Sequence, residues 1–172
     1  MDVREAIRTR RSVRRYSDAA VDIQVLHRLV EAGCWAPTAD NAQTWRFVVV
    51  TDAARMSKLR MIAPGFIGRA PAAIAVCQDM AEAERRLGAA DAMALAPMDS
   101  AMAALNIMLE AHAEGLGTCV VASFNRDALQ KLLRLPEHVV PLLLVAVGYA
   151  KATPSAPPRE VDGVCYFEEY HE

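Results

Sequence analysis

The sequence predicts an α+β or mixed α/β layer fold built around one sheet. Of its 172 residues, 53% are apolar and 23% are charged, which is typical of a chain with a packed core. Segments with helical spacing alternate with short runs of β-branched residues. We find neither an internal repeat nor a dividing linker, so we expect one domain over residues 1–172, in which 149–172 form a C-terminal arm.

In the first half of the chain, loops rich in small residues, glycine and proline separate the predicted elements. The segment at 10–16 is too polar for a core element, and Asp22 is a suitable N-cap for the helix that follows it. In chain order we expect a helix at 2–9, the polar segment at 10–16, a helix from Asp22 that ends before Pro37, a loop at 36–44, a strand at 46–51, a helix at 52–62 and a strand at 72–77.

The second half is dominated by one long apolar helix, expected at 97–114 with Pro97 in its first turn. Apolar residues cover most of its circumference, which indicates a helix at the centre of the fold or in an interface. The remaining expected elements are a strand at 118–122, a helix at 126–133 capped by Asn125, a strand at 139–147 interrupted by Pro141, and the proline-rich arm after Gly148.

Composition argues against several function classes. The net charge of -2 gives no basic excess for nucleic acid, and no apolar run approaches the ~20 residues that span a bilayer. No leader segment is expected at Met1–Arg15, so we expect a cytoplasmic protein with no membrane partner. The histidines and cysteines do not cluster, so we expect no metal site. The cysteines are expected to be reduced core thiols, and they are Cys34, Cys77, Cys119 and Cys165.

No nucleophile or acid–base pair stands out, so we expect no catalytic side chain and a cofactor that carries the chemistry. The arginine-rich segment Arg10-Arg11-Ser12-Val13-Arg14-Arg15-Tyr16 is the first candidate for holding one. Two guanidinium groups and a hydroxyl within three residues can surround a phosphate with charge-assisted hydrogen bonds. A solvated arginine face is the alternative interpretation.

The second candidate is the loop Ala36-Pro37-Thr38-Ala39-Asp40-Asn41-Ala42-Gln43-Thr44 that precedes the strand at 46–51. Its small residues allow a planar ligand to approach the backbone closely. Asn41 and Gln43 offer amide donors and acceptors of the kind that read the edge of a flavin ring. An ordinary turn before a strand is the alternative.

Two further segments complete the pattern: Gly115-Leu116-Gly117-Thr118 before a strand, and the lone Arg159 after the last core strand. Taken in this order and spacing, the four segments resemble the nitroreductase family of FMN-dependent oxidoreductases, over nearly the whole chain. The resemblance implies a three-layer fold, with a mainly antiparallel mixed sheet flanked by helices, and an intertwined homodimer that holds FMN at its interface.

The resemblance also implies roles for individual residues. Arg10, Arg11 and Ser12 fall where the family holds the phosphate and ribityl chain, and Arg159 falls where a late arginine closes on the phosphate. Arg14 falls where a cation lies near flavin N1 and O2. The remaining expected contacts are those of the partner subunit's loop (Pro37, Thr38, Asn41 and Gln43) and of the strand end beside the ring (Val121, Ala122 and Ser123).

The implied activity is ping-pong electron transfer from NAD(P)H through FMN to a small electrophilic acceptor such as a nitroaromatic, a quinone, an enone or a flavin. Two departures from the family pattern stand out: Thr44 replaces a proline, and Asp40 occupies a position that is usually small or neutral. A flavin-binding protein without turnover would carry the same motifs and stays an alternative. A third hypothesis is a protein that binds nucleic acid or an acidic partner through the arginines of Arg4–Arg15.

Overall fold

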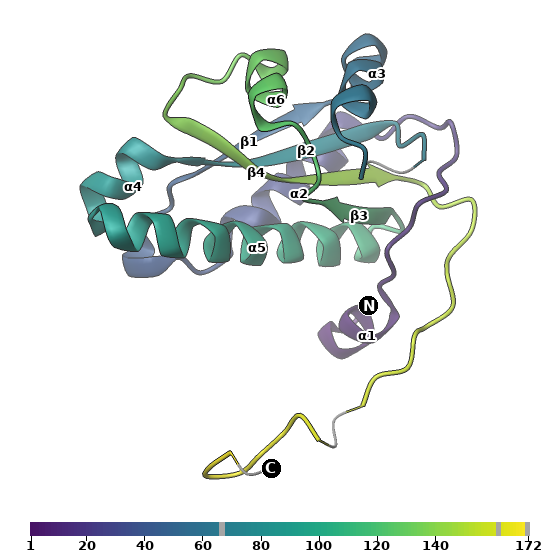
Figure 1. Ribbon diagram of the computed structural model, residues 1–172. Coiled ribbons are helices and arrows are strands. Elements are labelled where there is room, and N and C mark those ends of the chain that lie inside the picture. Colours follow the sequence, from purple (N-terminus) through teal and green to yellow (C-terminus); the bar gives the residue numbers. More distant parts are fainter. Residues whose placement is uncertain (66–67, 161–162, 171–172) are drawn as a thin grey trace.

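The computed structural model describes residues 1–65, 68–160 and 163–170. Over these residues it contains six α-helices, one short 3-10 helix and a four-stranded sheet (Figure 1). In chain order the elements are α1 (Val3–Thr9), α2 (Ile23–Cys34), the 3-10 helix η1 (Ala39–Asn41), β1 (Trp45–Val50), α3 (Ala53–Ile62), β2 (Ala72–Asp79), α4 (Met80–Leu87), α5 (Ala89–Ala113), β3 (Gly117–Val121), α6 (Arg126–Leu133) and β4 (Val139–Gly148).

The sheet has the order β1-β2-β4-β3, and each neighbouring pair of strands is antiparallel. The mainly antiparallel sheet expected from the sequence is therefore confirmed. Its parallel component is a single bridge between Ser12 and Thr118 outside the named strands. The register shifts where Pro141 meets Cys77, which is the interruption expected at this proline, because proline has no N–H to give to the ladder.

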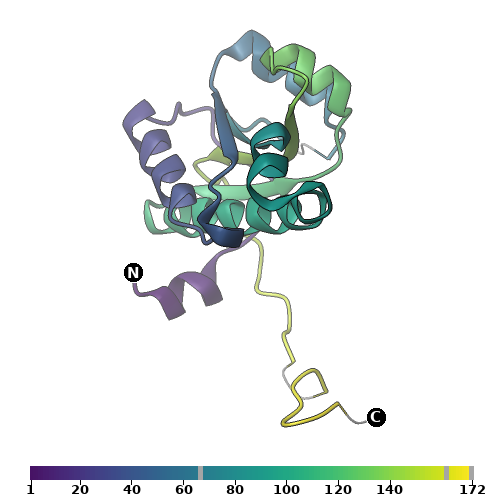
Figure 2. The ribbon, with the colours of Figure 1, turned by 90° about the vertical axis from the view of Figure 1, so that its left-hand side faces the viewer.

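Helices cover both faces of the sheet and produce the expected three layers (Figures 1 and 2). On one face α3 and α6 bury Met56, Leu59 and Leu129 against alternate residues of the strands. On the other face α2 and α5 bury Leu26 and Ile107 against the opposite set. Because strand side chains alternate between faces, β2 is buried along nearly its whole length and forms the centre of both cores.

Two expectations about helices were wrong. The long helix begins at Ala89, so Pro97 lies in its interior and not in its first turn. The ring leaves the carbonyl of Met93 without its helical partner, but Met93 and Pro97 are both exposed, so water can solvate that carbonyl. Helix α4 was not expected at all. Asp79 caps it by accepting a hydrogen bond from the N–H of Glu82 at 3.0 Å.

The environment of the cysteines also differs in part. All four are free, and Cys77 and Cys119 are buried as expected, whereas Cys34 and Cys165 are exposed. Cys34 ends α2 and Cys165 lies in the C-terminal arm, where no core covers it. Positions 161–162 and 171–172 of the expected arm lie outside the described residues.

Helix α5 has the length and the mean hydropathy of a membrane-spanning helix. One side of it is nevertheless buried against the sheet and α2, through Ala103, Ala104, Ile107 and Ala111. That packing makes α5 the central helix of the folded unit. It also positions the candidate site, because segments from both ends of the chain meet near its C-terminal end (Figure 1).

Candidate functional site

The arginine-rich segment lies along the edge strand β3. The N–H of Val13 donates to the carbonyl of Thr118 at 2.8 Å, and Ser12 forms a parallel bridge with the same residue. Tyr16 forms an antiparallel bridge with Ala150 at the start of the arm. The N-terminal segment is thus hydrogen-bonded to β3 and to the arm, which explains why residues 10–16 are ordered although they are polar.

Two glycines allow this close approach. A Cβ atom at Gly117 would lie 2.7 Å from the side chain of Val13, and a Cβ atom at Gly68 would overlap the carbonyl group of Arg14. Gly68 also has a φ of 84°, which favours glycine. The hydroxyl of Tyr16 donates to the carbonyl of Val13 at 2.6 Å, and burial raises the pKa of this phenol well above its ordinary value. These contacts fix the backbone that carries Arg14.

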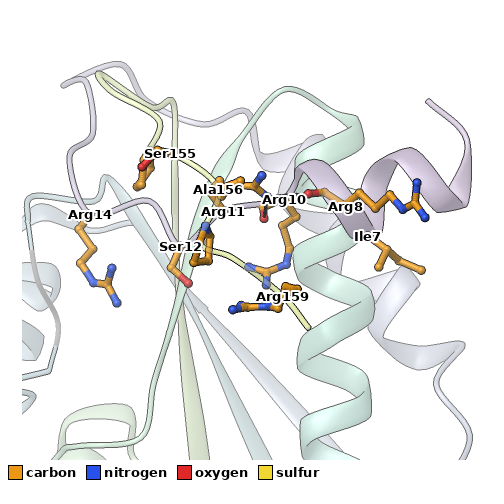
Figure 3. A pocket seen from close by; sticks show the side chains of 11 residues that line it. Ile7, Arg8, Arg10, Arg11, Ser12, Arg14, Ser155, Ala156 and Arg159 are labelled. Atoms are coloured by element: carbon orange, nitrogen blue, oxygen red, sulfur yellow. Dashed lines mark hydrogen bonds between the residues drawn. The ribbon is translucent and has the colours of Figure 1, made fainter. Parts of the chain in front are cut away.

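Segment 10–14 and the arm enclose a cavity of about 660 Å³ (Figure 3). In the part of the chain that the structure describes, its lining contains five arginines and no carboxylate. The full lining is Ile7, Arg8, Arg10, Arg11, Ser12, Arg14, Pro154, Ser155, Ala156, Pro157 and Arg159. The structure therefore brings together the residues expected to contact a phosphate. It adds Arg8, which sequence reasoning missed although helical spacing places it on the last turn before the segment.

Among the described residues, no ion pair neutralises the arginines of this cavity. The ion pairs found across the described residues involve other side chains. The Nη1 atom of Arg11 donates to the carbonyls of Arg8 and Arg10 at 2.7 and 2.8 Å, which holds its guanidinium in place. Figure 3 shows Arg10 and Arg159 close together, with Arg14 farther along the segment. Uncompensated cations around a concave surface produce a strongly positive potential that favours anionic ligands.

The strand end expected beside a flavin ring lies at the far end of β3. Val121 is buried, whereas Ala122 and Ser123 are exposed. Ala122 lies four residues beyond Thr118, a span of about 13 Å at ~3.3 Å per residue. A Cβ atom at Gly65 would lie 3.0 Å from Val121, so the loop after α3 packs closely against this strand end.

The loop with Asn41 and Gln43 has a specific, strained conformation. Asp40, Asn41 and Gln43 have φ values of 46°, 51° and 51°, in the left-handed region. The amide of Gln43 donates through Nε2 to Oδ1 of Asn41 at 2.7 Å, and its backbone N–H donates to Oγ1 of Thr38 at 3.1 Å. Pro37, Asp40, Asn41 and Gln43 are exposed. The loop thus presents polar side chains to a ligand or to another chain.

Within one chain this loop does not reach the arginine cavity. Its backbone N–H at Ala39 is hydrogen-bonded to Asp99 in the N-terminal half of α5, whereas Arg10 and Arg11 of the cavity also line a neighbouring hollow with His112, at the C-terminal end of that helix. The thirteen residues from Asp99 to His112 span about 20 Å at ~1.5 Å per residue. The loop residues Pro37 to Gln43 and the arginines therefore form two separate groups in one subunit.

Comparisons with known proteins agree on one family. The family model described as Nitroreductase family matches residues 7–64 and 58–149. A Methanothermobacter thermautotrophicus protein, whose name pairs NADH dehydrogenase with NAD(P)H nitroreductase, is 34% identical over 160 residues, which cover 90% of this chain and 80% of that protein. The FMN reductase [NAD(P)H] of Bacillus subtilis is 27% identical, with 92% and 70% covered.

Solved structures give the same result for the fold. The crystal structure of a nitroreductase family protein from Streptococcus pneumoniae superimposes with a TM-score of 0.87 at 22% identity, and covers 96% of this chain and 99% of that one. The fold and the order of its elements are thus shared by proteins whose sequences differ at most positions.

Proposed function

This chain belongs to the nitroreductase family, and from that premise we propose that it is an FMN-dependent enzyme that passes electrons from NAD(P)H to a small electrophilic acceptor. The observation that carries the proposal is the cavity of about 660 Å³ lined by Arg8, Arg10, Arg11, Arg14 and Arg159. Its volume lies in the range of small-molecule sites, about 300–1,000 Å³. The five cations of its described lining fit a ligand that carries a dianionic phosphate.

Different residues of the cavity would contact different parts of FMN. Arg10, Arg11 and Arg159 would bind the phosphate from both ends of the chain, with the hydroxyl of Ser12 as a further donor. Arg11 is already oriented by the two backbone carbonyls it contacts, so little entropy is lost when it binds. When bound, FMN supplies a two-electron carrier that nicotinamide can reduce and an acceptor can reoxidise.

Arg14 is the residue that would adjust the redox potential of the cofactor. It lies apart from Arg10 and Arg159 along the segment, and its backbone is fixed against Gly68 (Figure 3). A fixed cation favours whichever redox state carries more negative charge nearby, and reduction of a flavin adds that charge. The side chains of Arg10 and Arg14 thus serve different steps, the first binding and the second reduction.

A homodimer would complete the site. An exposed apolar stripe runs along α5 at helical spacing, through Met98, Met102 and Leu105. Trp35 lies 81% exposed at the end of α2. Contiguous exposed apolar surface of this kind is characteristic of interfaces. We infer that α5 packs against its copy, so that the loop containing Asn41 and Gln43 reaches the arginine cavity of the partner.

The position of the two-fold axis follows from the same helix. The loop is anchored at Asp99, and the cavity lies near His112. A two-fold axis that places the loop of one subunit at the cavity of the other must pass near the midpoint of these two residues, beside Leu105 and Asn106. Leu105 is 45% exposed and lies within the apolar stripe. In a two-fold interface a residue beside the axis contacts its own copy. The exposed stripe and the separation of the two half-sites therefore lead to the same arrangement.

The exposed residues of the loop would contact the electron acceptor. Asn41 and Gln43 offer hydrogen-bond donors and acceptors without a charge or a nucleophile, so they can orient a nitro, quinone or enone oxygen but cannot attack it. Protons would come from solvent. A cytoplasmic location suits this proposal, because NAD(P)H is available there and the exposed thiol of Cys34 stays reduced.

The test is optical and kinetic. The purified protein should be yellow with flavin absorbance, and rapid mixing with NADH or NADPH under anaerobic conditions should bleach it. Addition of a nitroaromatic, quinone, enone or free flavin should restore the colour. A colourless protein that takes up no added FMN would overturn the proposal. A yellow protein that neither nicotinamide bleaches would be a flavin-binding protein without turnover.

A further inference from the structure

A buried polar network lies beneath the loop of residues 38–44. Five polar or charged side chains are buried across the described residues: Thr44, Gln78, Asp99, Ser100 and Thr118. Hydrogen bonds join Thr44, Gln78 and Ser100, and Asp99 adjoins Ser100 on α5; the exposed fractions of these four residues range from 0 to 3%. Buried polar groups destabilise a core unless they are hydrogen-bonded, so such a concentration at one place calls for a specific role.

One part of the network is a chain of hydrogen bonds across three elements. The hydroxyl of Thr44 donates to Oε1 of Gln78 on β2 at 2.7 Å. Nε2 of Gln78 then donates to Oγ of Ser100 on α5 at 3.0 Å and to the carbonyl of Ala96 at 3.3 Å. Both polar atoms of the Gln78 side chain therefore have partners, and the end of the loop is tied to the long helix.

The other part holds the start of the loop. The carboxylate of Asp99 accepts a hydrogen bond from the backbone of Ala39, the first residue of η1. Asp99 and Ser100 are neighbours on α5, so one of two adjacent helical residues contacts the start of the loop and the other reaches its end through Gln78. We define these four side chains, Thr44, Gln78, Asp99 and Ser100, as the loop clamp.

The clamp explains how the loop keeps its strained backbone. Asp40, Asn41 and Gln43 each have a left-handed φ, which costs non-glycine residues free energy and persists only where the surroundings determine it. The hydrogen bonds among Thr38, Asn41 and Gln43 are exposed, and exposed bonds alone hold a loop weakly. The buried bonds at Ala39 and Thr44 fix the two ends between which these residues lie.

We propose that the loop clamp positions Asn41 and Gln43 for their contacts with the flavin and the acceptor in the partner subunit. The proposal rests on the proposed function for its ligand, but the clamp itself is a property of the free protein. The clamp residues are positioning residues, because they are buried and act through the loop. Two of them, Asp99 and Ser100, lie on α5, which also carries the exposed stripe of the expected interface, so one helix contributes to both the interface and the loop.

The test compares Thr44→Val, which removes the hydroxyl at nearly constant volume, with Thr44→Ser, which keeps it. Hydrogen exchange of the FMN-free protein is measured on peptides covering residues 36–45, and FMN dissociation constants are measured by flavin fluorescence. Thr44→Val should speed exchange of the loop about tenfold and raise the FMN dissociation constant about tenfold, the factor typical of one buried hydrogen bond. Thr44→Ser should restore both to within about twofold.

Val50→Ala is the matched control for a general loss of stability. Val50 is a buried residue at the end of β1, the strand that Thr44 precedes, and it packs in the core formed by α3 and α6. This variant should lower the melting temperature and leave loop exchange and the FMN dissociation constant unchanged. The proposal is overturned if Thr44→Val changes neither quantity, or if Val50→Ala changes both as strongly. If the unaltered protein binds no FMN, the proposed function fails, while the exchange data still decide whether the clamp holds the loop.

Discussion

The imidazole Nε2 atom of His112 lies 2.7 Å from the hydroxyl Oγ1 atom of Thr9, and this contact joins the C-terminal end of α5 to the end of α1. The Thr9 hydroxyl also donates to the carbonyl of Glu5 at 2.7 Å. Because a hydroxyl has one proton, Nε2 of His112 must be the donor in the first contact. Arg10 directly follows Thr9 in the chain, so the titratable imidazole of His112 lies beside the expected phosphate site.

FMN binding should therefore take up a proton at His112. Burial lowers the pKa of His112, the charges of Arg10 and Arg11 lower it further, and Glu5 opposes them. A phosphate dianion at these arginines would offset their charge and raise that pKa in the complex. The complex then binds more protons than the free protein, so affinity should rise as pH falls through the range near the ordinary histidine pKa of about 6.5.

His112→Gln isolates this effect, because glutamine keeps a donor for Thr9 but does not titrate. The FMN dissociation constant of both proteins should be measured by fluorescence across this pH range. Titration of the phosphate itself is common to both and cancels in the ratio. The ratio of the two dissociation constants should change with pH, and a constant ratio would show that His112 does not respond to the ligand.

Removal of Arg10 should weaken FMN binding. Arg10 lines the cavity beside Arg159, and hydrogen bonds to charged groups contribute about 1.5–3 kcal/mol each. Arg10→Ala should thus raise the FMN dissociation constant by about 10- to 100-fold. Arg15→Ala is the control, since Arg15 is exposed and lies outside the cavity lining. Equal dissociation constants for Arg10→Ala and the unaltered protein would remove Arg10 from the site.

Removal of the Arg14 charge should make the flavin harder to reduce. With the cation gone, the reduced state loses its stabilisation, so Arg14→Leu should lower the midpoint potential by about 30–60 mV, where 30 mV corresponds to 1.4 kcal/mol for two electrons. Spectroelectrochemical titration measures it. Arg15→Leu removes a neighbouring exposed charge and should change the potential less. Similar shifts in the two variants would mean that Arg14 acts only through the net charge of the segment.

A cysteine at Leu105 should crosslink the dimer to itself. If the two-fold axis passes beside Leu105, the two copies of this residue lie close enough for Leu105→Cys to form a disulfide under mild oxidation. Met93→Cys is the control on the same helix. Twelve residues from the axis, its two copies would be about 36 Å apart. Because Cys34 and Cys165 are exposed, the unaltered protein must be oxidised in parallel.

Non-reducing electrophoresis measures the outcome. Dimeric bands specific to Leu105→Cys would support the axis, and crosslinking of Met93→Cys at the same rate would contradict it. Leu105→Asp offers an independent check, since a carboxylate in the apolar stripe should dissociate the dimer and weaken FMN binding together.

Most helices and strands could be predicted because their capping residues and apolar patterns lie within the same short stretch of sequence. Asn125 caps α6 by accepting a hydrogen bond from the N–H of Ala128 at 2.9 Å, as its sequence position indicates. The missed helix α4 has a weaker signal, because it has only eight residues, half of them are charged, and Ala83 is its only fully buried residue. Pro97 was placed at a helix start because interior prolines are usually unfavourable, whereas solvent exposure makes this one tolerable.

The parts of the site that could not be predicted depend on distant partners. The sequence marks Thr44 only as a departure from the family pattern, since nothing local shows that its hydroxyl is buried against Gln78, 34 residues away. The sequence shows only that His112 does not cluster with other histidines or cysteines, because its partner Thr9 is 103 residues away. The contact between Gly68 and Arg14 likewise appears only in three dimensions. The roles of the expected FMN-binding residues stay predictions.

Replacing Asp99 by asparagine should stabilise the protein at neutral pH. Burial raises the pKa of Asp99, and the hydrogen bond from Ala39 offsets this only in part. As pH rises past the ordinary aspartate pKa of about 3.9, the unfolded chain ionises while the folded chain still binds the proton. The folded state then binds more protons, so stability falls until the pH has passed the raised pKa. Asparagine keeps an oxygen that can accept the hydrogen bond from Ala39, but it does not ionise. The Asp99→Asn variant should therefore not lose stability as the pH rises.

Melting temperatures of both proteins between pH 3 and pH 8 test this sign. The advantage of Asp99→Asn should be absent at the acidic end and grow with pH, by a few degrees if about 1 kcal/mol is recovered in a domain of this size. Asp99→Ala removes the acceptor and should lower the melting temperature at every pH. A lower melting temperature for Asp99→Asn at neutral pH would show that the Asp99 charge itself stabilises the loop, which contradicts the burial argument.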